Sequence, residues 1–219
     1  MNPDELTEVS FKELIKITKL FNIHGLTPIV VGGWAVYYYT KREKSVDIDL
    51  VFPSKNAIQI FEKHFKQQGF KKEKQAKIRE LFKKEVETRA GKQEIEIDIF
   101  TLQNKNRLAS DKSIEIPWKL SEKYGKEWQL EKDVTARVPE KEVLLLYKAA
   151  ALVDRQFKLK NWINLSRFVK DRLKAKIEKD KRDIGSLLAL EIDEKKLALL
   201  LKETGFEKQF NKITKELKE

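Results

Sequence analysis

The sequence predicts an α/β (α+β) core with a small mixed sheet, followed by an all-helical C-terminal domain. Apolar and acidic residues alternate with a period of two at 46–52 and 93–100, which is typical of strands. Stretches with helical spacing separate these strands. From residue 139 onward the pattern is helical throughout, with leucine runs at 187–190 and 197–201.

The expected elements of the first half follow directly from this pattern. Apolar residues at helical spacing stop at glycine, a hydrophobic run precedes a Gly-Gly pair, and Ser54 is a natural N-cap. The predicted elements are a helix from 11 to about 25, a strand at 28–31, a helix at 34–40, a strand at 46–52, a helix from 54 to about 69, and a hairpin of strands 82–89 and 93–100 joined by Ala90-Gly91-Lys92.

The second half begins with weaker signals. Short extended pieces are expected at 114–116 and 134–138, and Pro139 suits the first turn of a helix that runs to about residue 157. A chain of 219 residues exceeds the usual domain size of about 100–150. We therefore expect an α/β domain at 1–110, a connecting segment at 111–138 and a helical domain at 139–219.

Composition and charge exclude several classes of protein. The chain has no cysteine and only two histidines, His24 and His64, far apart in the sequence. A disulfide scaffold, a thiolate zinc site and a cysteine nucleophile are thereby excluded. The formal net charge is +11 and the pI is about 9.5, which favours a polyanionic partner.

Nothing in the sequence predicts a membrane protein. The most apolar stretch, Val143 to Val153, is interrupted by Lys148 and is far shorter than the roughly 20 residues that cross a bilayer. The polar start, Met1 to Glu5, has no apolar signal region. We therefore expect a cytoplasmic protein.

The positive charge is concentrated in two segments. Residues 63–84 carry nine basic and two acidic side chains, and residues 155–182 carry eleven and three. One interpretation is that lysines line solvated helix faces. The other is nucleic-acid binding, which Phe157, Trp162 and Phe168 favour in the second segment, because aromatic rings stack on bases while lysines contact phosphates.

Asp47 and Asp49 are the strongest chemical signal. Residues two apart on a strand project from the same face, so these carboxylates would converge and repel unless a cation lies between them. Oxygen ligands of this kind suit Mg²⁺. Asp98, on the second acidic strand, is a candidate third ligand of a two-metal site. The alternative is a polar strand face that meets solvent.

Gly32 and Gly33 lie between a hydrophobic strand and a helix. This placement lets backbone N–H groups approach an anion such as a triphosphate. The sequence lacks the third glycine of a dinucleotide fingerprint and the Gly-Lys-Ser/Thr of a Walker loop. Alone, the pair is equally consistent with a simple turn.

Together, the hydrophobic strand with Gly32-Gly33, the spacing of thirteen residues between Gly33 and Asp47, and Val46-Asp47-Ile48-Asp49-Leu50 resemble the DNA polymerase β-like nucleotidyltransferase superfamily. The resemblance implies that the glycines hold an NTP and that Asp47 and Asp49 bind Mg²⁺, with Mn²⁺ as an alternative. It also implies that Asp98 completes the two-metal site and assists deprotonation of the acceptor. Ser45 matches a residue that touches phosphate, and Glu96 rivals Asp98 as the third carboxylate.

A second resemblance covers 138–184. The helix with Lys148 and Arg155 looks like that of abortive-infection-type nucleotidyltransferase toxins, which implies that both cations bind the nucleotide. A lysine among Leu, Tyr and Ala must otherwise snorkel or pair. The toxins' Lys-Asp-x-x-Asp element is matched in its letters by 179–184 and in its spacing by 160–165, where amides replace both acids.

We therefore expect an enzyme, a Mg²⁺-dependent nucleotidyltransferase that moves an NMP from an NTP, ATP among them, to an acceptor hydroxyl and releases pyrophosphate. The charge distribution favours RNA or tRNA as the acceptor. A small molecule or a protein hydroxyl is the alternative acceptor, and a non-catalytic RNA-binding or toxin–antitoxin module is the alternative class. The toxin resemblance also implies an antitoxin partner.

Overall fold

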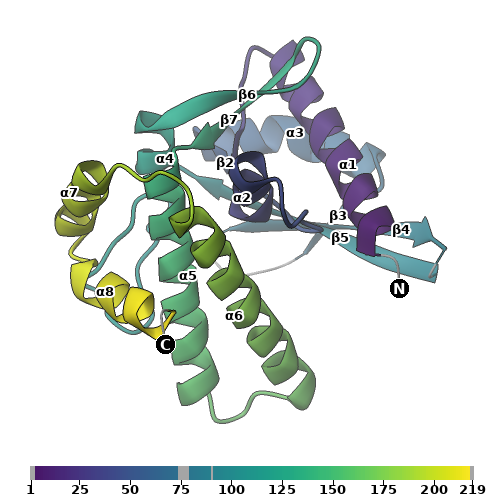
Figure 1. Ribbon diagram of the computed structural model, residues 1–219. Helices are drawn as coiled ribbons and strands as arrows, with labels where there is room; N and C mark the ends of the chain where they lie inside the picture. Colours follow the sequence, from purple (N-terminus) through teal and green to yellow (C-terminus); the bar gives the residue numbers. More distant parts are fainter. Residues whose placement is uncertain (1–2, 74–78, 90, 218–219) are drawn as a thin grey trace. The chain divides into compact units, whose positions relative to one another are not determined.

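A seven-stranded mixed sheet forms the centre of the N-terminal part of the protein (Figure 1). The structure is a computed structural model that describes residues 3–73, 79–89 and 91–217. The strands are β1 (Ile29–Val31), β2 (Ile48–Phe52), β3 (Lys71–Glu73), β4 (Glu80–Thr88), β5 (Gly91–Thr101), β6 (Gly125–Glu131) and β7 (Val134–Pro139). Their order in the sheet is β3-β4-β5-β2-β1-β7-β6. The predicted mixed sheet is confirmed.

Strand pairing brings together segments that are distant in the sequence. Strand β1 runs antiparallel to β2 with Val31 opposite Asp49, and β2 runs parallel to β5 with Asp49 beside Asp98. Strands β4 and β5 form the expected antiparallel hairpin. Ala90 of the predicted hairpin turn lies outside the described residues.

Helices α1 (Pro3–Ile23), α2 (Gly32–Thr40), α3 (Lys55–Gln67) and α4 (Lys119–Lys123) accompany this sheet. The ring of Phe21 on α1 lies 4.4 Å from that of Phe52 on β2 and 3.7 Å from that of Phe61 on α3, and all three side chains are buried. Ser54 caps α3 as predicted, accepting a hydrogen bond from the Ala57 N–H at 3.4 Å. Apolar burial therefore fixes both helices against the centre of the sheet.

Two boundaries differ from the sequence-based expectation. The strand predicted at 46–52 begins at Ile48, because pairing with β5 starts at Ile48 and pairing with β1 reaches only to Asp49. Pro139 does not open the following helix. It ends β7, where it pairs with Gly125, and the Glu140 N–H extends the ladder to the Tyr124 carbonyl at 2.8 Å.

The chain divides into two compact units. The first is Met1–Asn104 with Trp118–Glu140, and the second is Lys105–Pro117 with Lys141–Glu219. The segment expected to connect two domains, 111–138, contains α4, β6 and most of β7. Within the first unit, Trp118 stacks on Phe100 with ring centroids 4.4 Å apart.

The second unit is the expected helical region. It contains α5 (Lys141–Asn161), α6 (Arg167–Leu188), α7 (Glu194–Thr204) and α8 (Glu207–Glu216). Ser166 and Asp193 cap α6 and α7 through their side-chain oxygens. No helix in the described part of the chain is long and apolar enough to span a membrane.

Candidate active site

The start of α2 lies against the Asp49 carboxylate. Gly32 has φ +65°, a conformation that side chains rarely adopt. A Cβ atom built on Gly32 would stand 1.9 Å from Asp49 Oδ2 and 2.6 Å from its Cγ. Only glycine therefore allows the first turn of α2 and the Asp49 carboxylate to occupy their positions together. Gly33, the next residue, is buried.

Asp49 and Asp98 are direct neighbours across β2 and β5. They are register partners in a parallel pair, whose strands lie about 4.8 Å apart, so their side chains project from the same face of the sheet. Asp98 is only 7% exposed. The Arg79 guanidinium contacts Asp98 Oδ2 at 2.6 Å and supplies positive charge at this carboxylate.

Asp47 lies in a bend immediately before β2 and is half-buried. The buried Ser45 hydroxyl donates to the Asp47 carbonyl at 3.0 Å. Ser10 on α1 donates to the Val46 carbonyl at 2.6 Å and accepts from the Trp34 indole N–H at 3.2 Å. The backbone that carries Asp47 is therefore anchored by hydroxyls on both sides.

Glu96, the rival third carboxylate, has a different surrounding. It lies two residues before Asp98 on β5, is 8% exposed, and contacts the Lys83 ammonium at 3.3 Å. Lys83 also pairs with Glu94 at 2.9 Å and Glu73 at 3.2 Å. The hydrogen bond to Glu94, reinforced by the other two carboxylates, raises the pKa of Lys83 well above its usual range. Glu96 thus belongs to a lysine-centred ion-pair cluster, whereas Asp98 is beside Asp49.

In the described residues, no group of three or more His, Cys, Asp or Glu side chains is arranged to hold a metal ion. The two histidines, distant in the sequence, have ring centroids 6.0 Å apart. In the described ranges this pair is not part of a three-ligand group either.

Lys148 and Arg155 meet two acids of α6. Lys148 is 8% exposed, and its ammonium lies 2.7 Å from Asp183 Oδ2 and 3.6 Å from Asp180 Oδ1. The Arg155 guanidinium pairs with the other oxygen of Asp180. Both aspartates are buried, with Asp183 3% exposed and Asp180 2% exposed. The two cations and two anions form one buried network between α5 and α6.

This network uses the acids of the element at 179–184. The other candidate, 160–165, lies at the end of α5 and in the connection to α6, and five of its six residues are exposed. Both segments were candidates for the Lys-Asp-x-x-Asp element in the sequence. In the structure, the acids of 179–184 contact Lys148 and Arg155. Lys148 therefore does not extend to solvent, because its ammonium forms ion pairs with Asp183 and Asp180.

The first basic segment, 63–84, is largely neutralised where it is described; its residues 74–78 lie outside the described residues. Lys72 bridges Glu62 at 3.2 Å and Glu80 at 3.0 Å, and Lys66 pairs with Glu62 at 3.3 Å. On β4, Lys84 pairs with the buried Glu13 at 3.1 Å. Five of the seven basic side chains that the structure describes in this segment therefore contact a carboxylate.

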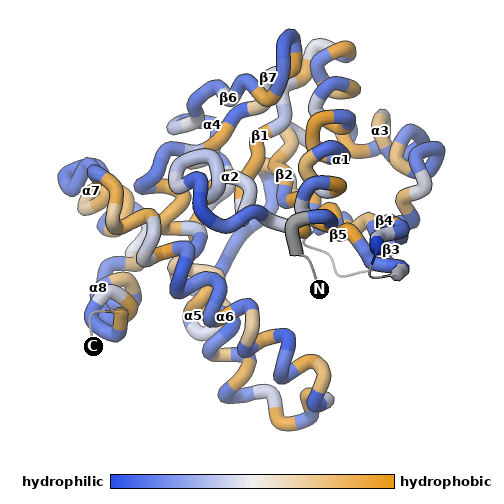
Figure 2. Tube along the Cα trace, turned by 45° about the vertical axis from the view of Figure 1, so that its right-hand side comes forward, coloured by the Kyte–Doolittle hydropathy of each residue, from blue (hydrophilic) through white to orange (hydrophobic). Residues whose placement is uncertain are grey.

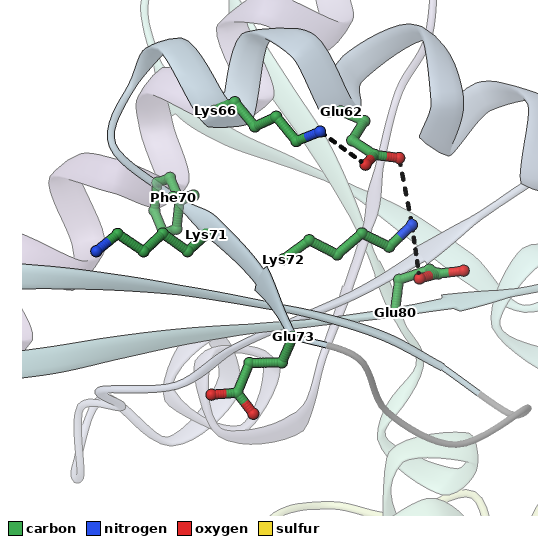
Figure 3. A pocket seen from close by; sticks show the side chains of 7 residues that line it. All are labelled: Glu62, Lys66, Phe70, Lys71, Lys72, Glu73 and Glu80. Atoms are coloured by element: carbon green, nitrogen blue, oxygen red, sulfur yellow. Dashed lines mark hydrogen bonds and ion pairs between the residues drawn. The ribbon is translucent and has the colours of Figure 1, made fainter.

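A cavity of ≈ 580 Å³ opens beside α3, β3 and β4 (Figure 3). It is lined by Glu62, Lys66, Phe70, Lys71, Lys72, Glu73 and Glu80. The close-up shows Lys66 and Lys72 directed at Glu62, with Lys72 also reaching Glu80, so these four charged side chains of the lining pair with one another. None of the predicted site residues lines this cavity.

Four residues that contact the candidate residues or the backbone beside them were not identified from the sequence in this role. Arg79 belongs to a segment read only as basic, and its pairing with Asp98 depends on the β4–β5 hairpin. Ser10 was hidden in a helix, although a small polar residue on an otherwise apolar buried face is a usable signal. Asp180 and Asp183 were noted in a motif, but not as partners of Lys148.

Comparison with known protein families gives one match that covers most of the chain. A family model described as "Nucleotidyl transferase of unknown function (DUF2204)" matches residues 10–198. A search of curated proteins found no match.

A comparison with solved structures found a lincosamide antibiotic adenylyltransferase, LnuA, bound to lincomycin. It has 19% identity, coverage of 82% of this chain and 97% of that chain, and a TM-score of 0.48. JHP933 from Helicobacter pylori has 15% identity, coverage of 94% and 91%, and a TM-score of 0.41. The small alarmone synthetase 1 from Bacillus subtilis, bound to AMPCPP, has 14% identity, coverage of 85% and 89%, and a TM-score of 0.28. Because these TM-scores are below 0.5, the functional assignment rests on the family match alone.

Proposed function

The chain belongs to this family of nucleotidyl transferases, and on that premise we propose that it transfers an NMP from an NTP to a hydroxyl group of RNA in a reaction that depends on Mg²⁺. The observation that carries the proposal is the contact between Gly32 and Asp49, together with the register that sets Asp49 beside Asp98.

Two neighbouring carboxylates, Asp49 and Asp98, fit a divalent cation, because Mg²⁺ is commonly held by one or two carboxylates together with substrate phosphates. Adjacent carboxylates on one sheet face repel each other, and hard oxygen donors of this kind bind Mg²⁺. The Arg79 guanidinium already supplies positive charge at Asp98, which supports the proposal of a cation at this position. Asp47, Asp49 and Asp98 would hold Mg²⁺, with Mn²⁺ as a substitute. When bound, the metal neutralises charge on the phosphates and on the reacting oxygens.

In the proposed reaction, the acceptor oxygen forms a bond to the α-phosphorus and the bond from that phosphorus to the β-phosphate oxygen breaks. Pyrophosphate leaves with the electron pair, and Asp98 accepts the acceptor's proton. Gly32 and Gly33 present backbone N–H groups at the start of α2 to the triphosphate. Because little covalent chemistry falls to the protein, positioning and charge neutralisation supply most of the rate.

Ser45 has a supporting role in this scheme. Its buried hydroxyl donates to the Asp47 carbonyl and so fixes the bend from which the Asp47 carboxylate projects. Lys148 and Arg155 are proposed nucleotide ligands as well. Each is paired with a buried aspartate, so either cation would have to share that carboxylate with a phosphate or exchange it for one.

RNA is favoured as the acceptor by the exposed basic surface of the second unit, described below. A cytoplasmic location, where NTPs and RNA are available, goes with this proposal. The antitoxin implied by the toxin resemblance would be a second partner, recognisable as a co-expressed protein that lowers transfer.

A thermal-shift titration with Mg²⁺ and each NTP tests the proposal. We expect the wild-type melting temperature to rise only when metal and nucleotide are both present. Asp49→Asn keeps the shape of the side chain and should abolish that rise and lower transfer by at least about 10²-fold. Asp133→Asn, in the exposed β6–β7 turn, is the matched control and should behave as wild type. Equal stabilisation of wild type and Asp49→Asn would contradict the metal site.

A further inference from the structure

The end of the α5–α6 hairpin exposes a cluster of apolar side chains. This α5–α6 tip, residues 157–174, comprises the last turn of α5, the connection and the first two turns of α6. Four of the six large hydrophobic residues that are exposed in the described ranges lie here: Trp162 (51% exposed), Ile163 (90%), Phe168 (75%) and Val169 (38%). Orange segments mark this end of the hairpin in Figure 2.

The tip has a defined backbone despite its exposure. The Asn161 side chain donates to the Phe157 carbonyl at 2.8 Å, and the Ser166 side chain accepts from the Val169 N–H at 3.3 Å. These bonds end α5 and begin α6. The rings of Trp162 and Phe168 are therefore presented by fixed helix ends, which lowers the entropy cost of using them as a binding surface.

Basic side chains surround these rings. Lys160, Lys170 and Lys174 are exposed, and within the described ranges none of them makes an ion pair. The Lys158 ammonium lies 5.6 Å from the centroid of the Trp162 ring. Arg167 is 98% exposed, and its contact with Asp171 is long, at 3.9 Å. Lys160, Lys170 and Lys174 therefore offer positive charge that no carboxylate in the described part of the chain neutralises.

The contrast with the segment 63–84 decides between the two basic regions. There, Lys66, Lys72 and Lys84 each contact a carboxylate within about 3.3 Å. Such pairs must be broken before a phosphate can bind. At the tip no such exchange is needed, because the ammonium groups already face solvent.

We propose that the α5–α6 tip binds single-stranded RNA, with unpaired bases stacking on Trp162 and Phe168 and phosphates contacting the surrounding lysines. Aromatic rings interleaved with uncompensated cations are the usual means of holding single strands. The proposal rests on the proposed function, since it names the surface by which that enzyme would hold its RNA. An acidic protein would need the same charges but has no bases to stack.

The test measures binding of a labelled 12-nucleotide single-stranded RNA of mixed sequence to the full chain. Trp162→Ala with Phe168→Ala should weaken binding about ten- to hundredfold. Lys160→Gln with Lys170→Gln and Lys174→Gln should weaken it and flatten the slope of log K against log salt by up to about 2, since each phosphate contact contributes about 0.7. The charge-matched control, Lys63→Gln with Lys66→Gln and Lys71→Gln, should change affinity less than threefold.

All of these substitutions are on the surface, and unchanged melting temperatures will verify the fold. Competition with polyphosphate, which has phosphates but no bases, separates the contribution of base stacking to RNA binding from that of charge. If polyphosphate displaces RNA equally from wild type and from the aromatic variant, and the two bind RNA equally, the tip has no stacking role and the proposal is overturned. If the control triple loses as much affinity as the tip triple, the RNA site lies on the first basic segment instead.

The thermal-shift response to Mg²⁺ and NTP is measured on the same variants, and we expect it to match wild type in all of them. Wild type that binds the nucleotide with metal but no RNA would overturn the tip proposal while leaving the enzyme class intact. Wild type that binds RNA through the tip but shows no metal-dependent response to any NTP would overturn the proposed function instead. Preferential binding of polyglutamate over RNA would indicate an acidic protein as the partner and would also contradict the proposal.

Discussion

Replacing Gly32 with alanine tests how tightly the backbone of α2 and the Asp49 carboxylate are coupled. The substitution has two separable costs. The first is conformational, because alanine at φ +65° is disfavoured by about 1–2 kcal/mol. The second is steric, because the new methyl group would stand 1.9 Å from Asp49 Oδ2. The Asp49 carboxylate would have to rotate away, and the metal ligand proposed beside Asp98 would be displaced.

Gly25 offers a matched control. It has φ +71°, and a Cβ atom there would meet nothing within 4 Å. Gly25→Ala therefore carries the conformational cost without the clash. We expect it to lose about 2–8 °C in melting temperature, from the same 1–2 kcal/mol. Gly32→Ala should lose at least as much.

The functional readout separates the two variants. Gly25→Ala should retain the wild-type response to Mg²⁺ and NTP, whereas Gly32→Ala should lose it, because Asp49 would no longer lie at the proposed metal site. Titration calorimetry with a Mg²⁺–NTP complex measures this directly. A Gly32→Ala protein that binds the complex as tightly as Gly25→Ala would refute the role assigned to the Gly32–Asp49 contact.

Three further results are expected. Lys148→Met should lower the free energy of unfolding by about 3–5 kcal/mol in urea melts, because it leaves Asp183 buried without its cation, and adding Asp183→Asn should recover part of the loss; a neutral single variant would contradict the buried network. Arg79→Gln should raise Mg²⁺ affinity, measured by calorimetry, because the guanidinium no longer competes for Asp98; unchanged affinity would separate Asp98 from the metal site. Burial raises the pKa of Glu62, but hydrogen bonds from Lys72 and Lys66 outweigh this effect and hold the pKa below 4.5. Glu62 therefore stabilises the folded protein above pH 4.5, and this stabilisation is lost as the pH falls through the pKa that Glu62 has in the folded state. Acid melts should therefore destabilise wild type more than Glu62→Gln, and parallel curves would contradict this ion pair.

Much of the site was predictable because it is local. The alternation at 46–52 and 93–100 marked two strands with acidic faces, and the Gly32-Gly33 pair marked the strand-to-helix turn. The Gly-Gly, Asp-x-Asp spacing then indicated the nucleotidyltransferase class, which the family match confirms. What the pattern could not give is the register, because Asp49 meets Asp98 only through a parallel pairing across almost 50 residues.

The electrostatic partners were beyond sequence reasoning for the same reason. Lys148 and Asp183 are 35 residues apart and meet only because α5 and α6 pack side by side. Arg79 and Lys83 were counted as free charge in the sequence, yet each contacts a carboxylate in the fold. Net charge over a segment therefore overstated the basic surface of 63–84, where carboxylates from α1, α3 and β5 lie within reach.

At Pro139 the sequence-based prediction was wrong because strand pairing outweighed the preference of proline for the first turn of a helix. Proline is favoured at the first turn of a helix, but here the strand ladder extends through Pro139, opposite Gly125, and to the Glu140 N–H. A proline at the end of a strand costs little, because its missing N–H falls where pairing is about to stop.

The central claim is that this chain transfers a nucleotidyl group to RNA with release of pyrophosphate. Its most direct test incubates the protein with total RNA, Mg²⁺ and an NTP labelled either at the α- or at the γ-phosphate. We expect the α label to enter RNA and the γ label to appear only in pyrophosphate, with both signals absent from Asp49→Asn. Entry of the γ label into RNA, or transfer that survives in Asp49→Asn, would contradict the account.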